Sequence, residues 1–390
     1  MMMPMTKIGK KVQSFVAISA LALMTACAPT MPTTTTGPKV DTSKPVPVAL
    51  LVPQSSDATA QIAADLENAA RLAAAQLDDL EIDLRVYDTV GDATVAASVA
   101  RQAVDEGAKI IIGPLYAEAA NAAGTAVADD GVNILSFSNN TTIAGGNVFV
   151  LGKTFDNTAR RIVSFAAEQG KERAMVIHSD RIDGQMGLNA FQGAAADTKL
   201  RIVSAQSFEL TQESVVNTVP LIRASAEIED VDTLFLTSSS AGALPLLAQL
   251  LPEAGLDPAN VQYVGLTRWD IPPQTLELNG LQGGWFAVPD LTRTENFSTQ
   301  FQEQFGNRPH QLASLAFDGI AAIGALAQAG FDDILTREAL TQPSGFQGVD
   351  GIFRLKDDGT NERGLAIATV QDKQVLIIDP APRSFAITGF

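Results

Sequence analysis

The residues of this chain that could bind a small molecule follow short apolar segments in the sequence. Six polar clusters occupy such positions: Gln54-Ser55-Ser56, Pro114-Leu115-Tyr116, Ser136–Asn140, Ser179-Asp180, Ser238–Ser240 and Thr267–Asp270. Residues at the carboxyl ends of parallel strands face ligands, because backbone N–H groups and helix dipoles point at that edge of the sheet. Any single cluster is also explained as a set of helix caps. Together, six clusters on two sheets could line one cleft.

Arg268 and Trp269 have the most distinctive chemistry in these clusters. We expect Arg268 to contact an anion, because its guanidinium fork binds carboxylates bidentately. Trp269 could stack on a ring or a sugar of the ligand, or it could lie in the core. These residue types predict a small polar ligand.

The motifs that accompany common enzymatic chemistry are missing from the sequence. It contains no GxxxxGK[ST], GxSxG, HExxH or GxGxxG pattern. Its two histidines, His178 and His310, have the sequence surroundings of a strand end and of a loop. Its one cysteine, Cys27, leaves no thiol for catalysis or metal binding elsewhere. We therefore expect no enzymatic activity, no cofactor and no metal site.

The N-terminal segment predicts export. Lys7, Lys10 and Lys11 precede the apolar stretch Val12–Ala26, which is too short to span a bilayer. Its end, Leu23-Met24-Thr25-Ala26-Cys27, resembles the lipobox of bacterial lipoproteins, whose signal is cut before a cysteine that carries diacylglycerol. The alternative is an ordinary signal peptide with a chance cysteine.

The lipobox resemblance divides the N-terminal region in two. It implies a signal peptide at 1–26, followed at 27–45 by the lipidated Cys27 and a Pro/Thr-rich tether, which cannot bury a core. Ala28 stands where enterobacterial lipoproteins retained at the inner membrane carry aspartate. We therefore expect a lipid-anchored protein on the periplasmic side of the outer membrane.

The acidic composition excludes some partners. The formal net charge is −17, from 27 basic and 44 acidic residues, and loss of three lysines with residues 1–26 would make it −20. Such a charge argues against binding nucleic acid or docking on anionic lipid. We expect the acidic surface mainly to keep the protein soluble.

The alternation of short apolar strands with helices predicts an α/β fold. Strands such as Val46–Val52 and Lys109–Gly113 are continuously apolar, which is typical of a parallel sheet covered on both faces. Because the rhythm occurs twice, we expect two lobes, with two parallel doubly wound sheets joined by a hinge. We place lobe 1 at 46–152 plus 290–340 and lobe 2 at 153–289 plus 341–380. A short C-terminal β-meander is expected from Gly351–Leu355, Ala366–Gln371 and Gln374–Ile378.

Four blocks resemble the Leu/Ile/Val-binding group of type I periplasmic binding proteins. They are VALLVPQSSDA at 48–58, KIIIGPLYAEAANAA at 109–123, GVNILSFSNN at 131–140 and NVFVLG at 147–152. The resemblance extends over residues 46–380 and implies the two-lobed type I periplasmic-binding fold. It also implies where a ligand carboxylate is held, because the amino-acid-binding relatives use a serine after IIGP and a serine or threonine after the next strand.

The matching positions depart from that pattern. They lie near Tyr116 and Asn140, and Asp183 stands where a tyrosine is expected. Tyr116 would fill space that an amino acid occupies, and Asp183 would repel a carboxylate, so we expect that leucine-like amino acids are not bound. We predict that any cleft ligand is lined by Ser55, Tyr116, Ser138, Asn140, Asp183, Arg268 and Trp269.

Three blocks of the second half resemble the LpoA-type penicillin-binding protein activators, lipoproteins that stimulate a peptidoglycan synthase. They are GLTRWD at 265–270, GWFAVPD at 284–290 and RPHQLASLAFD at 308–318. This resemblance implies a non-enzymatic, lipid-anchored regulator whose partner is a peptidoglycan synthase. The alternative is the solute-binding receptor of an ABC importer, with an ABC permease as partner and a small polar or amino-acid-like ligand.

Overall fold

The computed structural model describes residues 37–330 and 333–385. The predicted signal peptide, Cys27 and the first part of the expected tether lie outside these residues. Within the described ranges, no helix has the length and apolar character needed to cross a membrane.

The first sheet of the described chain has five parallel strands in the order β2-β1-β3-β4-β5. They are β1 Val46–Val52, β2 Ile82–Asp88, β3 Ile110–Ile112, β4 Asn133–Ser136 and β5 Val148–Val150. The central strand β3 consists of three fully buried isoleucines, so both of its faces are covered. This is the property expected of a parallel strand inside an α/β fold.

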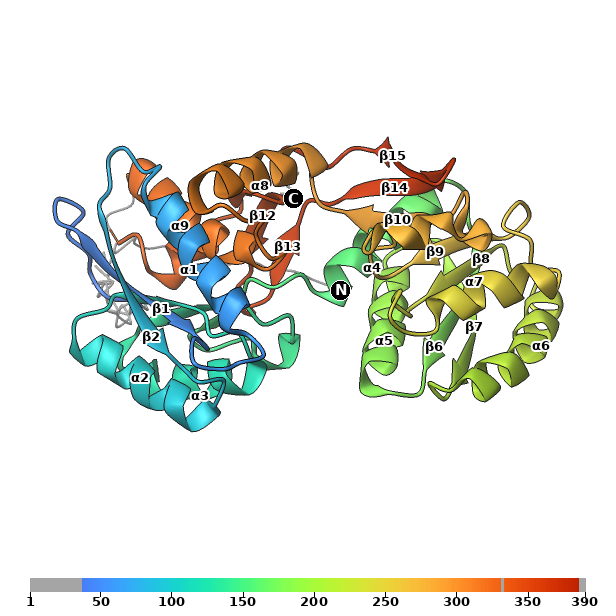
Figure 1. Ribbon diagram of the computed structural model, residues 1–390, viewed down its shortest axis with the longest axis horizontal. Coiled ribbons are helices and arrows are strands. Elements are labelled where there is room, and N and C mark those ends of the chain that lie inside the picture. Colours follow the sequence, from blue (N-terminus) through green and yellow to red (C-terminus); the bar gives the residue numbers. More distant parts are fainter. Residues whose placement is uncertain (1–36, 331–332, 386–390) are drawn as a thin grey trace, which may run out of the picture. The chain divides into compact units, whose positions relative to one another are not determined.

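Helices cover both faces of this sheet (Figure 1). They are α1 Ala60–Ala74, α2 Ala93–Asp105, α3 Ala117–Val127, α8 Leu291–Phe305, α9 Ala313–Gln328 and α10 Arg337–Leu340. Leu50 and Leu51 follow each other in β1 and therefore point to opposite faces. Leu50 packs in one core with α1 and α9, and Leu51 packs in another with α2 and α3.

The second sheet has seven strands among the described residues, in the order β15-β14-β10-β9-β8-β6-β7. Its strands are β6 Arg173–Ser179, β7 Arg201–Phe208, β8 Thr233–Leu236, β9 Gln262–Gly265, β10 Trp285–Val288, β14 Ala366–Gln371 and β15 Gln374–Asp379. β14 and β15 run antiparallel at one edge, and the other strands pair in parallel.

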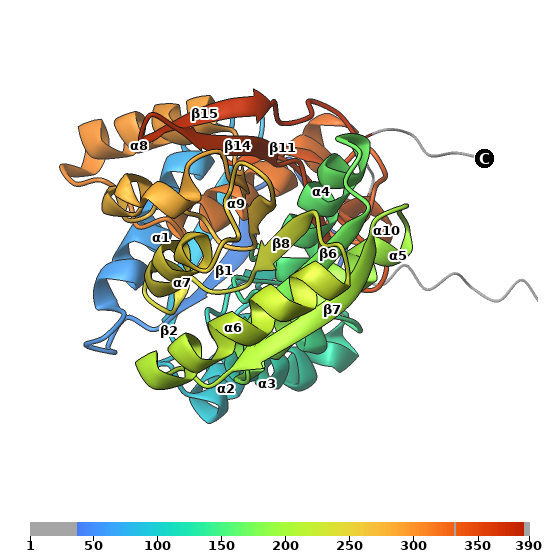
Figure 2. The same ribbon diagram turned by 90° about the vertical axis from the view of Figure 1, so that its right-hand side faces the viewer.

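The second sheet is also covered on both faces. Its helices are α4 Phe155–Glu168, α5 Ile182–Ala196, α6 Gln212–Ile228 and α7 Leu244–Glu253. α4 and α5 pack on one face, and α6 and α7 on the other, where α6 runs beside β7 (Figure 2). We call the first sheet with its helices lobe 1 and the second sheet with its helices lobe 2. In the described chain, the backbone crosses between the lobes after β5, after β10 and before β14.

The C-terminal region differs from the prediction. β11 Phe346–Gly348, β12 Gly351–Leu355 and β13 Asn361–Arg363 form a separate antiparallel sheet. Its side chains Phe346, Phe353 and Leu355 join the core of lobe 1, so this part of 341–380 does not belong to lobe 2. Only the β14–β15 hairpin joins lobe 2. The expected meander is therefore a three-stranded sheet and a hairpin that pack on different lobes, because the chain crosses between them at Gly364-Leu365.

Candidate functional site

A cavity of about 770 Å³ is lined by residues of both lobes. Lobe 1 contributes the loops that follow β3 and β4, and lobe 2 contributes the loops that follow β8 and β9. The rest of the wall comes from the crossing segments, from α4 and from the starts of α1 and α9. The cavity therefore lies at the carboxyl ends of parallel strands, the edge at which open α/β sheets bind ligands.

Tyr116, Ser138 and Asn140 line the cavity from lobe 1. Tyr116 is 39% exposed, and its ring lies over the loop before α2, where a Cβ on Gly91 would be 3.2 Å from the ring atom Cε2. The Ser138 hydroxyl oxygen accepts a hydrogen bond from the Asn140 N–H at 3.1 Å. The Asn140 amide oxygen in turn accepts one from the Thr142 N–H at 3.0 Å. These bonds define the shape of the loop after β4.

Arg268 lines the cavity from lobe 2. Its Nε donates to Asp270 Oδ1 at 2.8 Å, and its Nη2 donates to the other carboxylate oxygen, so the pair is bidentate. The Arg268 side chain is 26% exposed and that of Asp270 is 12% exposed. Asp270 does not line the cavity. It therefore positions the guanidinium, which is the more accessible of the two groups.

Lys153 and Arg363 bring two further cations to the cavity from the crossing segments. Lys153 Nζ lies 2.9 Å from Asp350 Oδ2, and Arg363 Nη1 lies 3.0 Å from Asp318 Oδ2. Burial opposes the ionisation of Asp350, but Lys153, Arg363 and the Ser314 hydroxyl outweigh it and lower the pKa of that carboxyl. Full burial raises the pKa of Asp318 despite its pairing with Arg363.

The wall of this cavity carries charge of one sign. Lys153, Arg268 and Arg363 line it, and none of its described lining residues is an Asp or a Glu. Each cation has a carboxylate partner, but that partner is not part of the wall. Ala117 and Phe155, the first residues of α3 and α4, also line the cavity, so two helix N-termini add positive partial charge. This arrangement favours a small anion.

The sequence comparison decides the family. A model of the family described as periplasmic binding protein matches residues 45–374. The match spans the first sheet, the second sheet apart from its edge strand β15, and every segment that lines the cavity. The chain belongs to the periplasmic binding protein family. Its two sheets form the two-lobed type I periplasmic-binding fold, as the sequence predicted, and membership implies an exported binding protein.

The fold of this chain is similar to that of several solved structures. A candidate branched-chain amino acid ABC transporter from Rhodospirillum rubrum is 18% identical with a TM-score of 0.73, covering 86% of this chain and 100% of that chain. A substrate-binding protein from Desulfitobacterium hafniense, solved with Leu, is 18% identical with a TM-score of 0.62 over 86% and 100%. A solute-binding protein from Rhodopseudomonas palustris, solved with 3,4-dihydroxybenzoic acid, is 17% identical with a TM-score of 0.59 over 87% and 97%. No curated protein matches the sequence.

Three residues predicted to line the cleft of this periplasmic binding protein do not line the cavity. Ser55 is exposed, and its N–H donates to Asp88 at 3.1 Å. The Asp183 side chain is 70% exposed at the start of α5. Trp269 is fully buried and stacks on Phe286, with ring centroids 5.6 Å apart. Its indole is therefore a core group, the second of the two roles considered from the sequence.

The geometry removes the two reasons for which leucine-like amino acids were expected to be excluded. Tyr116 lies over a neighbouring loop and leaves a cavity of about 770 Å³, so it does not fill the ligand space. Asp183 is outside the wall, so it is not placed to repel a carboxylate there. Neither departure from the family pattern therefore prevents a carboxylate from binding.

Sequence reasoning missed Lys153, Thr154, Asn157 and Arg363, all of which line the cavity. The first two lie three and four residues after the end of β5, so the same search for polar residues after strands could have found them. Asn157 lies in the first turn of α4 and donates to the Asn361 amide oxygen at 2.6 Å. For Arg363 no local signal exists, because it reaches the cavity only through the crossing before β14.

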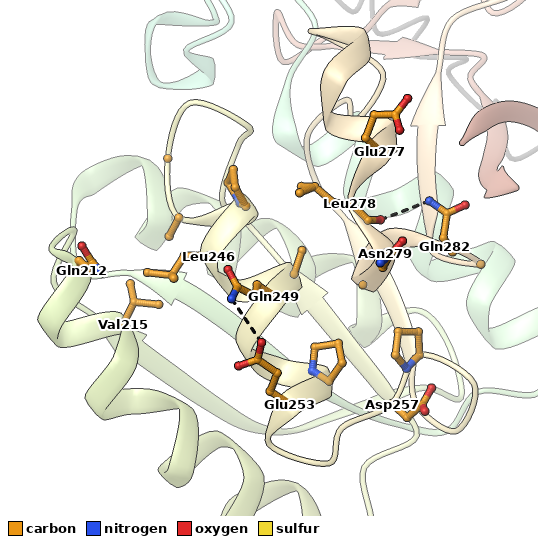
Figure 3. Close-up of a pocket in the computed structure, with 18 of the residues that line it drawn as sticks. Gln212, Val215, Leu246, Gln249, Glu253, Asp257, Glu277, Leu278, Asn279 and Gln282 are labelled. Atoms are coloured by element: carbon orange, nitrogen blue, oxygen red, sulfur yellow. Dashed lines mark hydrogen bonds between the residues drawn. The ribbon is translucent and has the colours of Figure 1, made fainter. Parts of the chain in front are cut away.

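A second cavity of about 1430 Å³ lies on lobe 2 alone, along α7 (Figure 3). None of its residues lines the cavity between the lobes. Leu246 and other apolar side chains form much of its wall, and its charged residues in the described chain are the acids Glu253, Asp257 and Glu277. We call this surface the α7 groove. It lacks the cations expected for an anionic ligand.

Proposed function

We propose that this protein is the solute-binding receptor of an ABC importer and captures a small carboxylate ligand between its two lobes. The observation that carries the proposal is the one-sided charge of the cavity wall. Arg268 comes from lobe 2 and Lys153 from a crossing segment, so cations reach the cavity from two different parts of the chain. An ABC permease is the partner that would receive the ligand.

The size and the chemistry of the cavity support this proposal. A volume of about 770 Å³ falls in the usual range for small-molecule sites, about 300–1,000 Å³. Guanidinium and ammonium groups favour carboxylates through charge-assisted hydrogen bonds. Leu and 3,4-dihydroxybenzoic acid, which two structural neighbours hold, both contain a carboxyl group. Hinge closure of two lobes around such a ligand is the motion that this architecture permits.

Thermal unfolding with a panel of small acids tests the proposal. A ligand present at 100 times its Kd stabilises a protein by about 2.7 kcal/mol, which is a clear shift in melting temperature. We expect at least one aliphatic, aromatic or amino acid to produce this shift, while neutral amides of the same shape do not. If the whole panel leaves the melting temperature unchanged, the proposal fails.

We further propose that the exported chain is anchored through a lipid on Cys27, on the periplasmic face of the outer membrane. The lipobox at residues 23–27 and the absence of an aspartate at position 28 support this anchor. Metabolic labelling with a radioactive fatty acid should mark the wild-type protein in the outer-membrane fraction. The Cys27→Ser variant should carry no label, and a labelled variant would contradict the anchor.

Regulation of a peptidoglycan synthase is a second candidate function, and the α7 groove is the observation that favours it. α7 is apolar except for Gln249 and Glu253, and Leu246 in the groove wall remains half-buried at the surface instead of being covered. Apolar helix residues normally face a core. A bifunctional penicillin-binding protein should then bind wild type and polymerise glycan faster, and Leu246→Asp should abolish both effects. The matched variant Leu221→Asp, on the exposed face of α6 outside the groove, should not. Absence of binding by wild type would eliminate this candidate.

A further inference from the structure

We propose that the cavity selects carboxylates that lack an ammonium group, such as aliphatic or aromatic acids, over amino acids; this rests on the proposed solute-binding function. An amino acid adds to its carboxylate an α-ammonium group, which has three N–H donors. A desolvated ammonium group needs carboxylate or several neutral oxygen acceptors. The oxygen atoms of the wall therefore decide which class of acid binds.

The carboxylates that pair with the cations of the wall already have hydrogen-bond or ion-pair partners. Arg268 holds both oxygens of Asp270. Asp350 accepts from Lys153 at 2.9 Å, and the buried Asp318 pairs with a cation of the wall and with a backbone N–H. None of the three lines the cavity. In the described wall, the cation of each pair is therefore accessible to a ligand, and its carboxylate partner is not.

Two neutral side-chain oxygens on the lobe 1 side, those of Ser138 and Asn140, are also in use. The Ser138 hydroxyl accepts from the Asn140 N–H, and the Asn140 amide oxygen accepts from both the N–H and the hydroxyl of Thr142, at 3.0 and 2.8 Å. Each of these bonds maintains the loop after β4. An incoming ammonium group would have to compete with them.

Electrostatic repulsion acts in the same direction. Like charges about 6 Å apart in a partly solvated site reduce affinity by about tenfold or more. An ammonium group placed beside a carboxylate that contacts Arg268 or Lys153 meets that repulsion. Phe137, Phe155 and Leu266 also line the cavity and suit the hydrocarbon body of an acid. The wall thus matches a carboxylate joined to an apolar group.

Matched ligand sets test this selectivity by calorimetry on the full mature chain. Leucine is compared with 4-methylpentanoate, which lacks only the amino group, and with 3-methylbutan-1-amine, which lacks only the carboxyl group. Phenylalanine, 3-phenylpropanoate and 2-phenylethylamine form the second set. We expect a des-amino acid to bind at least tenfold more tightly than its amino acid, and the amines not to bind. An amino acid that binds as tightly as its des-amino analogue overturns the selectivity and leaves the solute-binding function intact. Failure of both sets and of the wider acid panel overturns the solute-binding function itself.

The Asn140→Asp variant gives an independent readout. The change is isosteric, keeps the oxygen that accepts from Thr142, and adds a carboxylate to the wall. We expect it to move the ratio of affinities at least tenfold towards the amino acid. Asn121→Asp, an exposed site on α3 outside the cavity, changes the net charge equally and should leave the ratio unchanged. An unchanged ratio in Asn140→Asp overturns the inference.

Discussion

The guanidinium of Arg363 lies 3.0 Å from the carboxylate of Asp318, and both side chains are almost completely buried where the chain crosses between the lobes. Asp318 belongs to α9 of lobe 1, and Arg363 ends β13 just before the last crossing. Arg363 also donates to the carbonyl oxygen of Leu151 at 2.7 Å, at the end of β5. One side chain therefore ties together two of the crossing segments and the body of lobe 1.

Asp318→Asn should strongly destabilise the protein. The amide keeps the shape of the side chain but leaves the Arg363 cation without its counter-ion, and breaking a buried pair in this way costs about 3–5 kcal/mol. Urea unfolding followed by circular dichroism measures the change. Glu227→Gln is the matched control, because Glu227 pairs with Arg223 on an exposed helix face. Its expected cost is about 0.5 kcal/mol or less. Equal losses in the two variants would contradict the role of the buried pair.

Stability in acid should depend on Asp350. The pKa of its carboxyl is lowered in the folded protein, because Lys153 and Arg363 outweigh the effect of burial. The carboxylate therefore stabilises the fold above the unfolded pKa of about 3.9, and this contribution is lost as the pH falls through the folded pKa. From about pH 5 to about pH 2, wild type should lose more unfolding free energy than Asp350→Asn. Equal losses in urea titrations at the two pH values would refute this.

The framework of the fold could be predicted from sequence because its signals are local. A run such as Ile110–Ile112 can be covered on both faces only inside a parallel sheet, and it lies between helical segments on both sides. The destination of the C-terminal strands could not be predicted in the same way. β12 and β14 are both short apolar strands next to turns, and only the position of the crossing between them decides that one packs on lobe 1 and the other on lobe 2.

Part of the lining of the cavity could be predicted for the same reason. Tyr116, Ser138, Asn140 and Arg268 line the cavity because each follows a strand whose end forms its edge. Trp269 follows the same strand as Arg268, but the next side chain along a loop can turn into the core, and nothing in the sequence fixes that choice. The position of a residue along the chain shows that it is near the edge of the sheet. The direction of its side chain depends on packing.

Trp269 predicts a contrast between two glycine substitutions. A Cβ at Gly265 would lie 2.3 Å from the Trp269 ring, so Gly265→Ala should cost about 1–3 kcal/mol through overpacking. Gly193 lies inside α5 with no atom near its Cβ position, so Gly193→Ala should stabilise by about 0.5–1 kcal/mol. Denaturant midpoints and tryptophan fluorescence measure both changes. A neutral Gly265→Ala would show that the indole is not packed as described.

Arg268 is the residue on which the solute-binding account depends most. Calorimetric titration of wild type and Arg268→Gln with an acid that stabilises the wild-type protein tests it most directly. The account predicts that Arg268→Gln binds about 10–100-fold more weakly, the loss expected for one charged hydrogen-bonding partner. Its unfolding free energy should fall by about 1–3 kcal/mol, because the largely buried Asp270 loses its partner. Arg308→Gln, which removes an exposed cation paired with Glu295 outside the cavity, should bind as wild type does. Undiminished affinity in Arg268→Gln would contradict a carboxylate site between the lobes.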